Sequence, residues 1–175
     1  MPKPTHYLYL LILSTLLANG LKAQNHVINW QKQNPWVDSV MSTLTLDEKI
    51  AQLFTVAVWT QRDSNYQNEI EKQIRDYKIG GLMFMKGNPH KQAILTNRYQ
   101  SKSKVPLLIS IDGEWGLNMR LDSTPVFPRQ MVLGAANNEE LTQEMGAEIA
   151  KHCKRLGIHV NFAPDVDVNN NMANP

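Results

Sequence analysis

Cysteine is nearly absent from this chain of 175 residues, and the single Cys153 excludes an internal disulfide. Its position far from the N-terminus also excludes a lipoprotein acylated on a cysteine just after a signal peptide. Long hydrophobic runs are missing too. The apolar stretch from Tyr7 to Leu17 is shorter than the about 20 apolar residues that a membrane-spanning helix needs. We therefore expect no stable membrane anchor.

A strong excess of one charge is also lacking. Eighteen Lys and Arg residues against sixteen Asp and Glu residues leave a net charge of +2, and the basic residues are scattered, which argues against a nucleic acid partner. Phosphate-binding loops are missing as well. Gly80-Gly81 lacks the G-x-G-x-x-G spacing and no Walker-type loop occurs, so no nucleotide or other cofactor is predicted.

The N-terminus has the three parts of a secretory signal. Lys3 lies in a short basic start, an apolar core follows, and Leu21-Lys22-Ala23 is a cleavage site of small-residue type. We expect residues 1–23 to be a signal peptide, residues 24–43 to be a lead-in segment, and the protein to be exported to the periplasm or the extracellular space.

Strand and helix patterns alternate along the rest of the chain. A Thr45-Leu-Asp-Glu48 capping box opens a helix. Apolar runs predict strands over Leu53–Trp59, Ile79–Met85, Val105–Ile111 and Ile158–Ala163, and helical spacing predicts helices over Tyr66–Tyr77, Asn88–Gln100 and Glu139–Leu156. The stretch from Asp112 to about Asn138 is expected to be irregular. Val105–Ile111 is almost wholly apolar, as in strands buried on both faces.

This alternation predicts an α/β fold with a parallel sheet and helical crossovers. Two architectures fit. A doubly wound open sheet could be complete at this length, whereas an eight-stranded (β/α)8 barrel needs roughly 250 residues and would be only partly present.

Asp112 is the strongest candidate site residue because it directly follows the Val105–Ile111 strand, and ligands bind at the carboxyl ends of parallel strands. Glu114, Trp115 and Arg120 follow it closely. Charged groups hydrogen-bond strongly to hydroxyls, and an aromatic ring packs on an apolar face, so this set suits a sugar. An equally supported reading is structural, with Asp112 capping the turn and pairing with Arg120.

Other polar residues give weaker evidence for a functional site. Asp165, Asp167, Asn169 and Asn171 alternate like calcium-loop ligands, but Asn170 replaces the required glycine, so turn-stabilising side chains are favoured and no metal site is predicted.

The histidines and the cysteine have simpler interpretations. His152 and Cys153 are helix neighbours that point in different directions, which argues against a catalytic pair. Cys153 is expected in the core and His159 is expected to be structural.

Several ordered blocks resemble the N-terminal domain of glycoside hydrolase family 3 over about residues 44–175. They are Leu46-Asp-Glu-Lys-Ile-Ala-Gln-Leu53, Ile79-Gly-Gly-Leu-Met-Phe84, Pro106-Leu-Leu-Ile-Ser-Ile-Asp112, Phe127-Pro128 and Gly157-Ile-His-Val-Asn-Phe-Ala-Pro-Asp-Val-Asp167. The resemblance implies the N-terminal part of a (β/α)8 TIM-like barrel, incomplete in this chain.

The resemblance also implies sugar-binding roles for Asp112 and Arg120. They match the first and last positions of the Asp-Gln-Glu-Gly-Gly-Arg-Val-Gln-Arg motif of the β-N-acetylglucosaminidase branch. Glu114 and Gly116 agree with that motif, whereas Trp115 and four other positions depart from it. The family's nucleophile and general acid come later than Pro175, so no catalytic residue is assigned and the chain alone is expected to be inactive.

The expected activity is an exo-acting, retaining β-N-acetylhexosaminidase acting on a carbohydrate with a terminal β-linked N-acetylglucosamine. Two alternatives remain open. One is a β-glucosidase-type member of the family, which the departures in the motif allow. The other is a non-catalytic extracytoplasmic module that binds sugar through Asp112, Trp115 and Arg120.

Overall fold

The computed structural model describes residues 34–166, 170 and 173. The predicted signal peptide and most of the lead-in segment lie outside these residues. The chain divides into two compact units, Met1–Asp38 and Ser39–Pro175. Helix α2 (Pro35–Ser42) begins in the first unit, where the side-chain oxygen of Asn34 accepts a hydrogen bond from the Trp36 N–H at 3.1 Å.

The second unit alternates helices and strands, as the sequence predicts. Its elements are α3 (Leu46–Ala51), β1 (Thr55–Trp59), α4 (Ser64–Lys72), the π-helical turn η1 (Gln73–Tyr77), β2 (Gly81–Lys86), α5 (Pro89–Gln100), β3 (Leu108–Ile111), the 3-10 turn η2 (Leu117–Met119), α6 (Gln130–Ala136), α7 (Glu139–Arg155) and β4 (Val160–Asn161). No helix among the described residues is long and apolar enough to cross a membrane.

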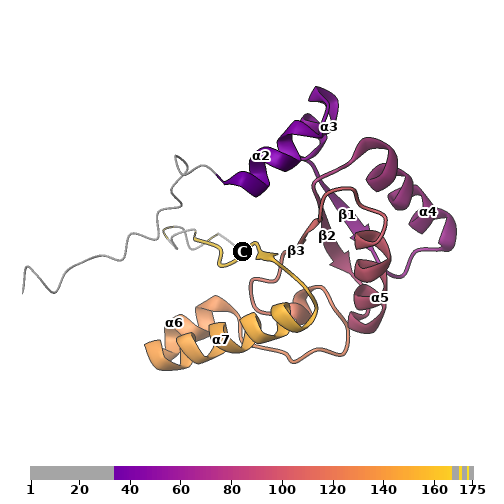
Figure 1. The fold of residues 1–175 in the computed structure, drawn as a ribbon. Coiled ribbons are helices and arrows are strands. Elements are labelled where there is room, and N and C mark those ends of the chain that lie inside the picture. Colours follow the sequence, from indigo (N-terminus) through magenta and orange to yellow (C-terminus); the bar gives the residue numbers. More distant parts are fainter. Residues whose placement is uncertain (1–33, 167–169, 171–172, 174–175) are drawn as a thin grey trace, which may run out of the picture. The chain divides into compact units, whose positions relative to one another are not determined.

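The four strands form one parallel sheet in the order β1-β2-β3-β4. A doubly wound sheet reverses its strand order at a switch point, and this sheet does not. Right-handed crossovers that all move the same way across a parallel sheet place their connecting helices on one face. Figure 1 shows α4 and α5 together on one side of the strands. The strand order therefore selects the barrel architecture, as a four-stranded part.

The core lies between the sheet and these helices. Register places Val58, Phe84 and Ile111 side by side, and likewise Leu82 and Ile109; all five have no exposed surface. We call this set the helix-covered face. Side chains from each crossover pack on it: Ile70, Ile74, Leu95, Tyr99, Ile149 and Cys153. Burial of these apolar side chains is the main source of stability.

The opposite face, which we call the open face, is formed by Thr55, Ala57, Met83, Leu108, Ser110 and Val160. Leu108 is 58% exposed and Val160 is 37% exposed. The prediction that the strand ending at Ile111 is buried on both faces is therefore wrong for Leu108. In a complete barrel this face would line the interior, but the four strands present leave it partly uncovered.

The predicted helix starts are confirmed where a cap was recognised. Thr45 and Glu48 form the capping box, and the Asn88 side chain accepts hydrogen bonds from the N–H groups of His90 and Lys91 ahead of Pro89. Gly157, after α7, has φ +68, as a glycine that ends a helix should.

Other boundaries differ from the predictions. Helix α4 begins two residues earlier than expected because Asp63 caps it by accepting from the Tyr66 N–H, and its last turn is π-helical. The stretch expected to be irregular contains η2 and α6. Strand β4 covers only two residues, since it pairs with β3 at Ser110 and Ile111 alone.

A side chain hydrogen-bonds to the backbone of β1 at the edge that faces away from β2. Thr60 N–H donates to Lys86 O of β2. Because backbone groups alternate in direction along a strand, the N–H and C=O groups of the odd-numbered residues of β1 point away from β2. The Tyr66 hydroxyl donates to one of them, the carbonyl of Ala57, at 3.1 Å. Burial raises the pKa of Tyr66, and a hydrogen bond from the Trp59 backbone opposes that rise. The hydroxyl therefore occupies the place of a neighbouring strand.

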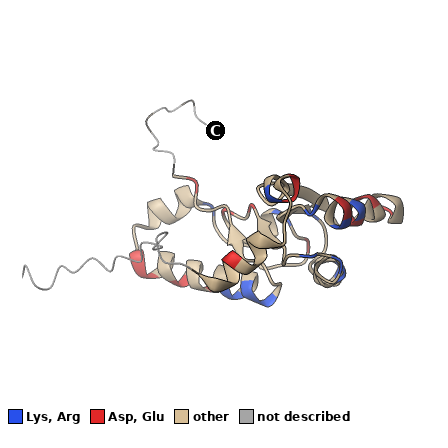
Figure 2. Ribbon diagram, turned by 45° about the horizontal axis from the view of Figure 1, so that its top comes forward, with Lys and Arg blue, Asp and Glu red and all other residues tan. Residues whose placement is uncertain are grey.

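Charge is spread over the helices rather than gathered on one of them. Helix α7 has acidic Glu139 and Glu140 in its first turn and basic Lys154 and Arg155 in its last turn, which suits the helix dipole. Figure 2 shows red and blue segments distributed among several helices.

Candidate functional site

Asp112 and Arg120, predicted as a pair, lie together at the carboxyl end of β3. The Arg120 guanidinium donates through Nη2 to Oδ2 of Asp112 and through Nε to the Asp112 carbonyl at 2.9 Å. Their side chains are 29% and 22% exposed. The pair is thus half-buried yet reachable from solvent, so charge-assisted hydrogen bonds to an incoming hydroxyl are possible.

These contacts close the segment Asp112–Arg120, which we call the site loop. Its C-terminal end is bonded to Gly87, which directly follows the neighbouring strand β2. The Gly87 N–H donates to Arg120 O at 3.1 Å, and the Asp122 N–H donates to Gly87 O at 2.8 Å. Leu117 of the loop and Leu121 just after it are buried in the hydrophobic core, with 1% and 0% exposure. The site loop is therefore built into the core rather than hanging from the strand.

Two residues that sequence reasoning missed brace the start of the site loop. The Asn161 side-chain amide accepts from the Gly113 N–H at 2.9 Å and donates to the Gly113 carbonyl at 3.1 Å. The Gln130 amide donates to Glu114 O at 2.8 Å. Asn161 lies near the carboxyl end of β4 and Gln130 begins α6, so no local sequence pattern could have linked either to the loop.

Gly116 completes the turn. Its N–H donates to Gly113 O at 3.0 Å, and its φ of +95 is one that side-chain-bearing residues rarely adopt. A Cβ added here would lie 2.6 Å from Cδ2 of Phe127. Glycine is required on both counts, because the turn packs directly against the Phe127 ring.

Trp115 and Glu114 occupy the middle of this turn and are both half-buried. The Arg129 guanidinium carbon lies 4.8 Å from the centroid of the Trp115 ring, in a cation–π arrangement. All four members of the predicted cluster thus belong to one loop, and direct bonding joins Asp112 to Arg120.

The remaining candidates behave as structural residues. His159 Nδ1 accepts from the Ile109 N–H at 2.9 Å, which satisfies a strand amide. Cys153 is buried, and burial raises the pKa of its thiol, so a reactive thiolate is disfavoured. His152 lies 3.5 Å from Glu148 and contacts the Phe127 ring. His152 and Cys153 thus contact different surroundings, His152 beside Glu148 and Phe127 and Cys153 in the core.

Four residues alternate like the ligands of a calcium-binding loop. Three of them, Asp167, Asn169 and Asn171, lie outside the described residues. Asp165 is exposed. Among the residues described, no group of three or more His, Cys, Asp or Glu side chains could hold a metal ion.

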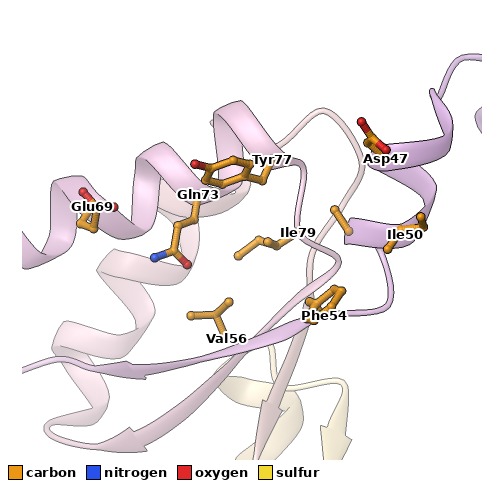
Figure 3. Close-up of a pocket in the computed structure, with 9 residues that line it drawn as sticks. Asp47, Ile50, Phe54, Val56, Glu69, Gln73, Tyr77 and Ile79 are labelled. Atoms are coloured by element: carbon orange, nitrogen blue, oxygen red, sulfur yellow. The ribbon is translucent and has the colours of Figure 1, made fainter.

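Grooves lie beside the sheet among the described residues. One of about 320 Å³ lies between the site loop and α6 and α7, lined by Glu114, Gln130, Leu133, Met145, Ile149 and Asn161 among others. A second of about 400 Å³ lies beside β1, among Ile50, Phe54, Val56, Gln73, Tyr77 and Ile79 (Figure 3). Its lining combines these apolar side chains with Asp47, Glu69 and Gln73. It lies on the helix side of β1, remote from the carboxyl ends of the strands.

Comparison with known proteins agrees with the geometry. Residues 45–175 match the model of the Glycosyl hydrolase family 3 N terminal domain. The chain belongs to glycosyl hydrolase family 3. The resemblance inferred from the sequence blocks is confirmed, and so is the partial TIM-barrel type of fold.

Curated relatives of this family 3 chain are named as glycosidases. It is 28% identical over 140 residues to the "Beta-N-acetylglucosaminidase/beta-glucosidase" of Cellulomonas fimi, a match covering 80% of this chain and 24% of that protein. It is 37% identical over 120 residues to "Beta-hexosaminidase A" of Pseudoalteromonas piscicida, covering 61% of this chain and 20% of that protein.

A solved structure shows the same fold. The "Beta-glucoside phosphorylase BglX" superposes with a TM-score of 0.61 at 23% identity, over 74% of this chain and 22% of that one. The chain thus spans only about a fifth to a quarter of the length of these three proteins.

Proposed function

We propose that this family 3 chain contributes the sugar-holding part of an exo-acting, retaining β-N-acetylhexosaminidase. The observation that carries the proposal is the Asp112–Arg120 pair, which the fold holds at the carboxyl end of β3 with both side chains partly open to solvent. The carboxylate accepts hydrogen bonds from sugar hydroxyls and the guanidinium donates to sugar oxygens. The relative named "Beta-hexosaminidase A" supports this choice of sugar, and so does the first part of the name "Beta-N-acetylglucosaminidase/beta-glucosidase".

In this proposal Asp112 and Arg120 position the terminal sugar and do not react with it. Orientation alone can lower the barrier strongly, because a well-placed anomeric carbon needs little further ordering. The retaining reaction requires a nucleophilic carboxylate and a proton donor. We assign neither to the described residues. We further propose export through residues 1–23, on the signal-like pattern of that segment.

A β-glucosidase-type activity is the second candidate. The Cellulomonas fimi relative is named for both activities, and a "Periplasmic beta-glucosidase" of Salmonella typhimurium is 26% identical over 162 residues. The choice between the two sugars rests on whether the site accommodates a 2-acetamido group.

Saturation-transfer NMR on the full chain with N-acetylglucosamine and with glucose tests the proposal. N-acetylglucosamine is expected to bind better, and Asp112→Asn to weaken binding at least tenfold, since a charged acceptor is lost. Glu71→Gln is the matched control, because it disrupts the Glu71–Arg98 pair, whose residues lie on α4 and α5. Preference for glucose would favour the second candidate, and no effect of Asp112→Asn would refute the site.

A further inference from the structure

The peptide group that joins Asp112 to Gly113 is held at both of its polar ends. Its carbonyl, which belongs to Asp112, accepts a hydrogen bond from Arg120 Nε at 2.9 Å. Its N–H, which belongs to Gly113, donates to Oδ1 of Asn161 at 2.9 Å. The N–H and C=O of a planar trans peptide group point in opposite directions. Rotation of this group would therefore break both bonds at once.

Asn161 makes its bonds where the pairing of β4 with β3 ends. The two strands pair up to Ile111, and the chain of β4 then turns, because the Ala163 N–H donates back to Asn161 O at 2.9 Å. The Asn161 side chain accepts from the Gly113 N–H and donates to the Gly113 carbonyl. A carboxamide has a donor and an acceptor, as a peptide group does. It therefore continues the strand pairing past Ile111 to the residue after Asp112.

Gln100 forms a matching pair of bonds at the opposite end of β3. Its side chain accepts from the Leu107 N–H at 2.9 Å and donates to the Leu107 carbonyl at 2.8 Å. Leu107 directly precedes β3, so this contact lies at the amino end of the strand. The two amides thus make the same kind of contact, but only that of Asn161 lies beside the Asp112–Arg120 pair. Comparison of the two separates support of the strand from an effect on the site.

The held peptide group is the common support of both sugar-binding side chains. The Asp112 side chain branches from the backbone at this group, and Arg120 bonds both to its carbonyl and to the Asp112 carboxylate. A binding group works well only when it is held within about 0.5 Å of its productive position. Groups ordered in advance also lose little conformational entropy on binding. The bond from Asn161 therefore bears on the placement of both.

We propose that Asn161 is a positioning residue for the Asp112–Arg120 pair and acts through the peptide group between Asp112 and Gly113. Asn161 does not touch the sugar in this proposal, which rests on the proposed function. Its loss lowers the affinity for sugar because the carboxylate and the guanidinium are then less well placed. The carboxyl end of β4 thereby contributes to a site whose sugar-binding groups all follow β3.

Asn161→Leu and Gln100→Met in the full chain test the proposal. Each variant replaces an amide by an apolar side chain of similar size and removes two hydrogen bonds to β3 or its continuation. Asn161→Leu is expected to weaken N-acetylglucosamine binding about fivefold, whereas Gln100→Met should leave it within about twofold. Titration followed by saturation-transfer NMR gives the affinities.

Amide hydrogen exchange measured by NMR locates each loss. The Gly113 amide should exchange at least about tenfold faster in Asn161→Leu and within about twofold of wild type in Gln100→Met, and the Leu107 amide should show the reverse. A general loss of stability would instead speed both amides in both variants. Asn161→Gln keeps a donor and an acceptor on a longer side chain and should retain part of the affinity.

A double-variant cycle tests whether Asn161 acts through Asp112. In the Asp112→Asn background, Asn161→Leu should weaken binding by less than about twofold, since the carboxylate that it positions is already gone. The same fivefold loss in that background would show that Asn161 acts independently of Asp112 and would overturn the proposal.

The remaining outcomes separate this proposal from the proposed function. Equal affinities of folded Asn161→Leu and Gln100→Met would overturn the role of Asn161 while sugar binding by Asp112 still stands. If Asn161→Leu does not fold, Asn161→Gln decides: wild-type affinity with a faster Gly113 amide overturns the role, and weaker affinity supports it. A wild-type chain that binds no N-acetylglucosamine would overturn both.

Discussion

The two faces of the sheet differ in how completely they are covered. On the helix-covered face, Phe84 and Ile109 have no exposed surface, whereas on the open face Leu108 is 58% exposed. The same strands supply both faces, so strand sequence alone does not explain the difference. What differs is the partner: side chains from three crossovers pack on one face, whereas the other face is partly uncovered, with Leu108 and Val160 exposed. The candidate site lies at the end of this sheet, where polar side chains replace apolar ones.

The largest expected effect comes from truncating a side chain on the helix-covered face. Phe84→Ala should lower the free energy of unfolding by about 3–5 kcal/mol, because it leaves a cavity in a fully packed region. Leu108→Ala on the open face should cost less than about 1 kcal/mol. Urea unfolding followed by circular dichroism measures both. Similar losses for the two variants would show that the open face is covered in solution.

A smaller loss is expected where the site loop meets the core. Gly116→Ala should destabilise the chain by about 1–3 kcal/mol, because φ is +95 and the new Cβ would meet Phe127. Gly146→Ala in α7 is the matched control, with no atom within 4 Å of its added Cβ, and should be neutral or slightly stabilising. Thermal unfolding of both variants provides the test. A Gly116→Ala protein as stable as the wild type would mean that the turn is not rigidly packed.

Helix α5, which packs on the helix-covered face, contributes a buried polar group whose ionisation is suppressed. Burial raises the pKa of Tyr99 to about 12 from an ordinary 10.0. Between these values the unfolded chain binds fewer protons than the folded chain, so the free energy of unfolding falls as pH rises from 10 to 12.

Tyr99→Phe should remove this part of the alkaline loss and change stability little at pH 7, since the hydroxyl has no hydrogen-bond partner among the described residues. Tyr77→Phe, at an exposed tyrosine, serves as control and should leave the pH dependence unchanged. Urea unfolding between pH 7 and 11 supplies the data. An identical alkaline slope in Tyr99→Phe would argue that this ring is solvated.

The smallest effect concerns the sheet edge. Tyr66→Phe removes the bond to Ala57 O and should cost about 0.5–1.5 kcal/mol. It also leaves the outward peptide groups of β1 free to pair with another chain. Sedimentation velocity should therefore show more self-association than in the wild type or Tyr77→Phe. Equal association of all three proteins would mean that the Tyr66 hydroxyl does not protect the edge.

Much of the fold was predictable because its signals are local. Thr45 and Glu48 form their capping box within one turn, and Asn88 caps α5 from the adjacent position. The four strands were expected from apolar runs, and Asp112 from its place directly after one of them. Chain neighbours set such features, so a short window of sequence contains the information.

The missed features depend on distant parts of the chain. Asn161 braces Gly113 across 48 residues, and Gln130 reaches Glu114 across 16. Helix α6 lacks a side-chain cap at Arg129, so the usual sign of a helix start was missing. The short β4 reflects the pairing available beside β3 rather than the apolar run Ile158–Ala163, whose length suggested a longer strand.

By itself, the sequence determined the alternation of strands and helices, the caps that begin the helices, and the placing of Asp112 at the end of a buried strand. Those outcomes follow from periodicity and from hydrogen bonds between near neighbours. The tertiary structure alone decided the unreversed strand order, the open face, and the bracing of the site loop by Asn161 and Gln130. Each of these requires groups far apart in the chain to meet, and only packing of the whole unit brings them together.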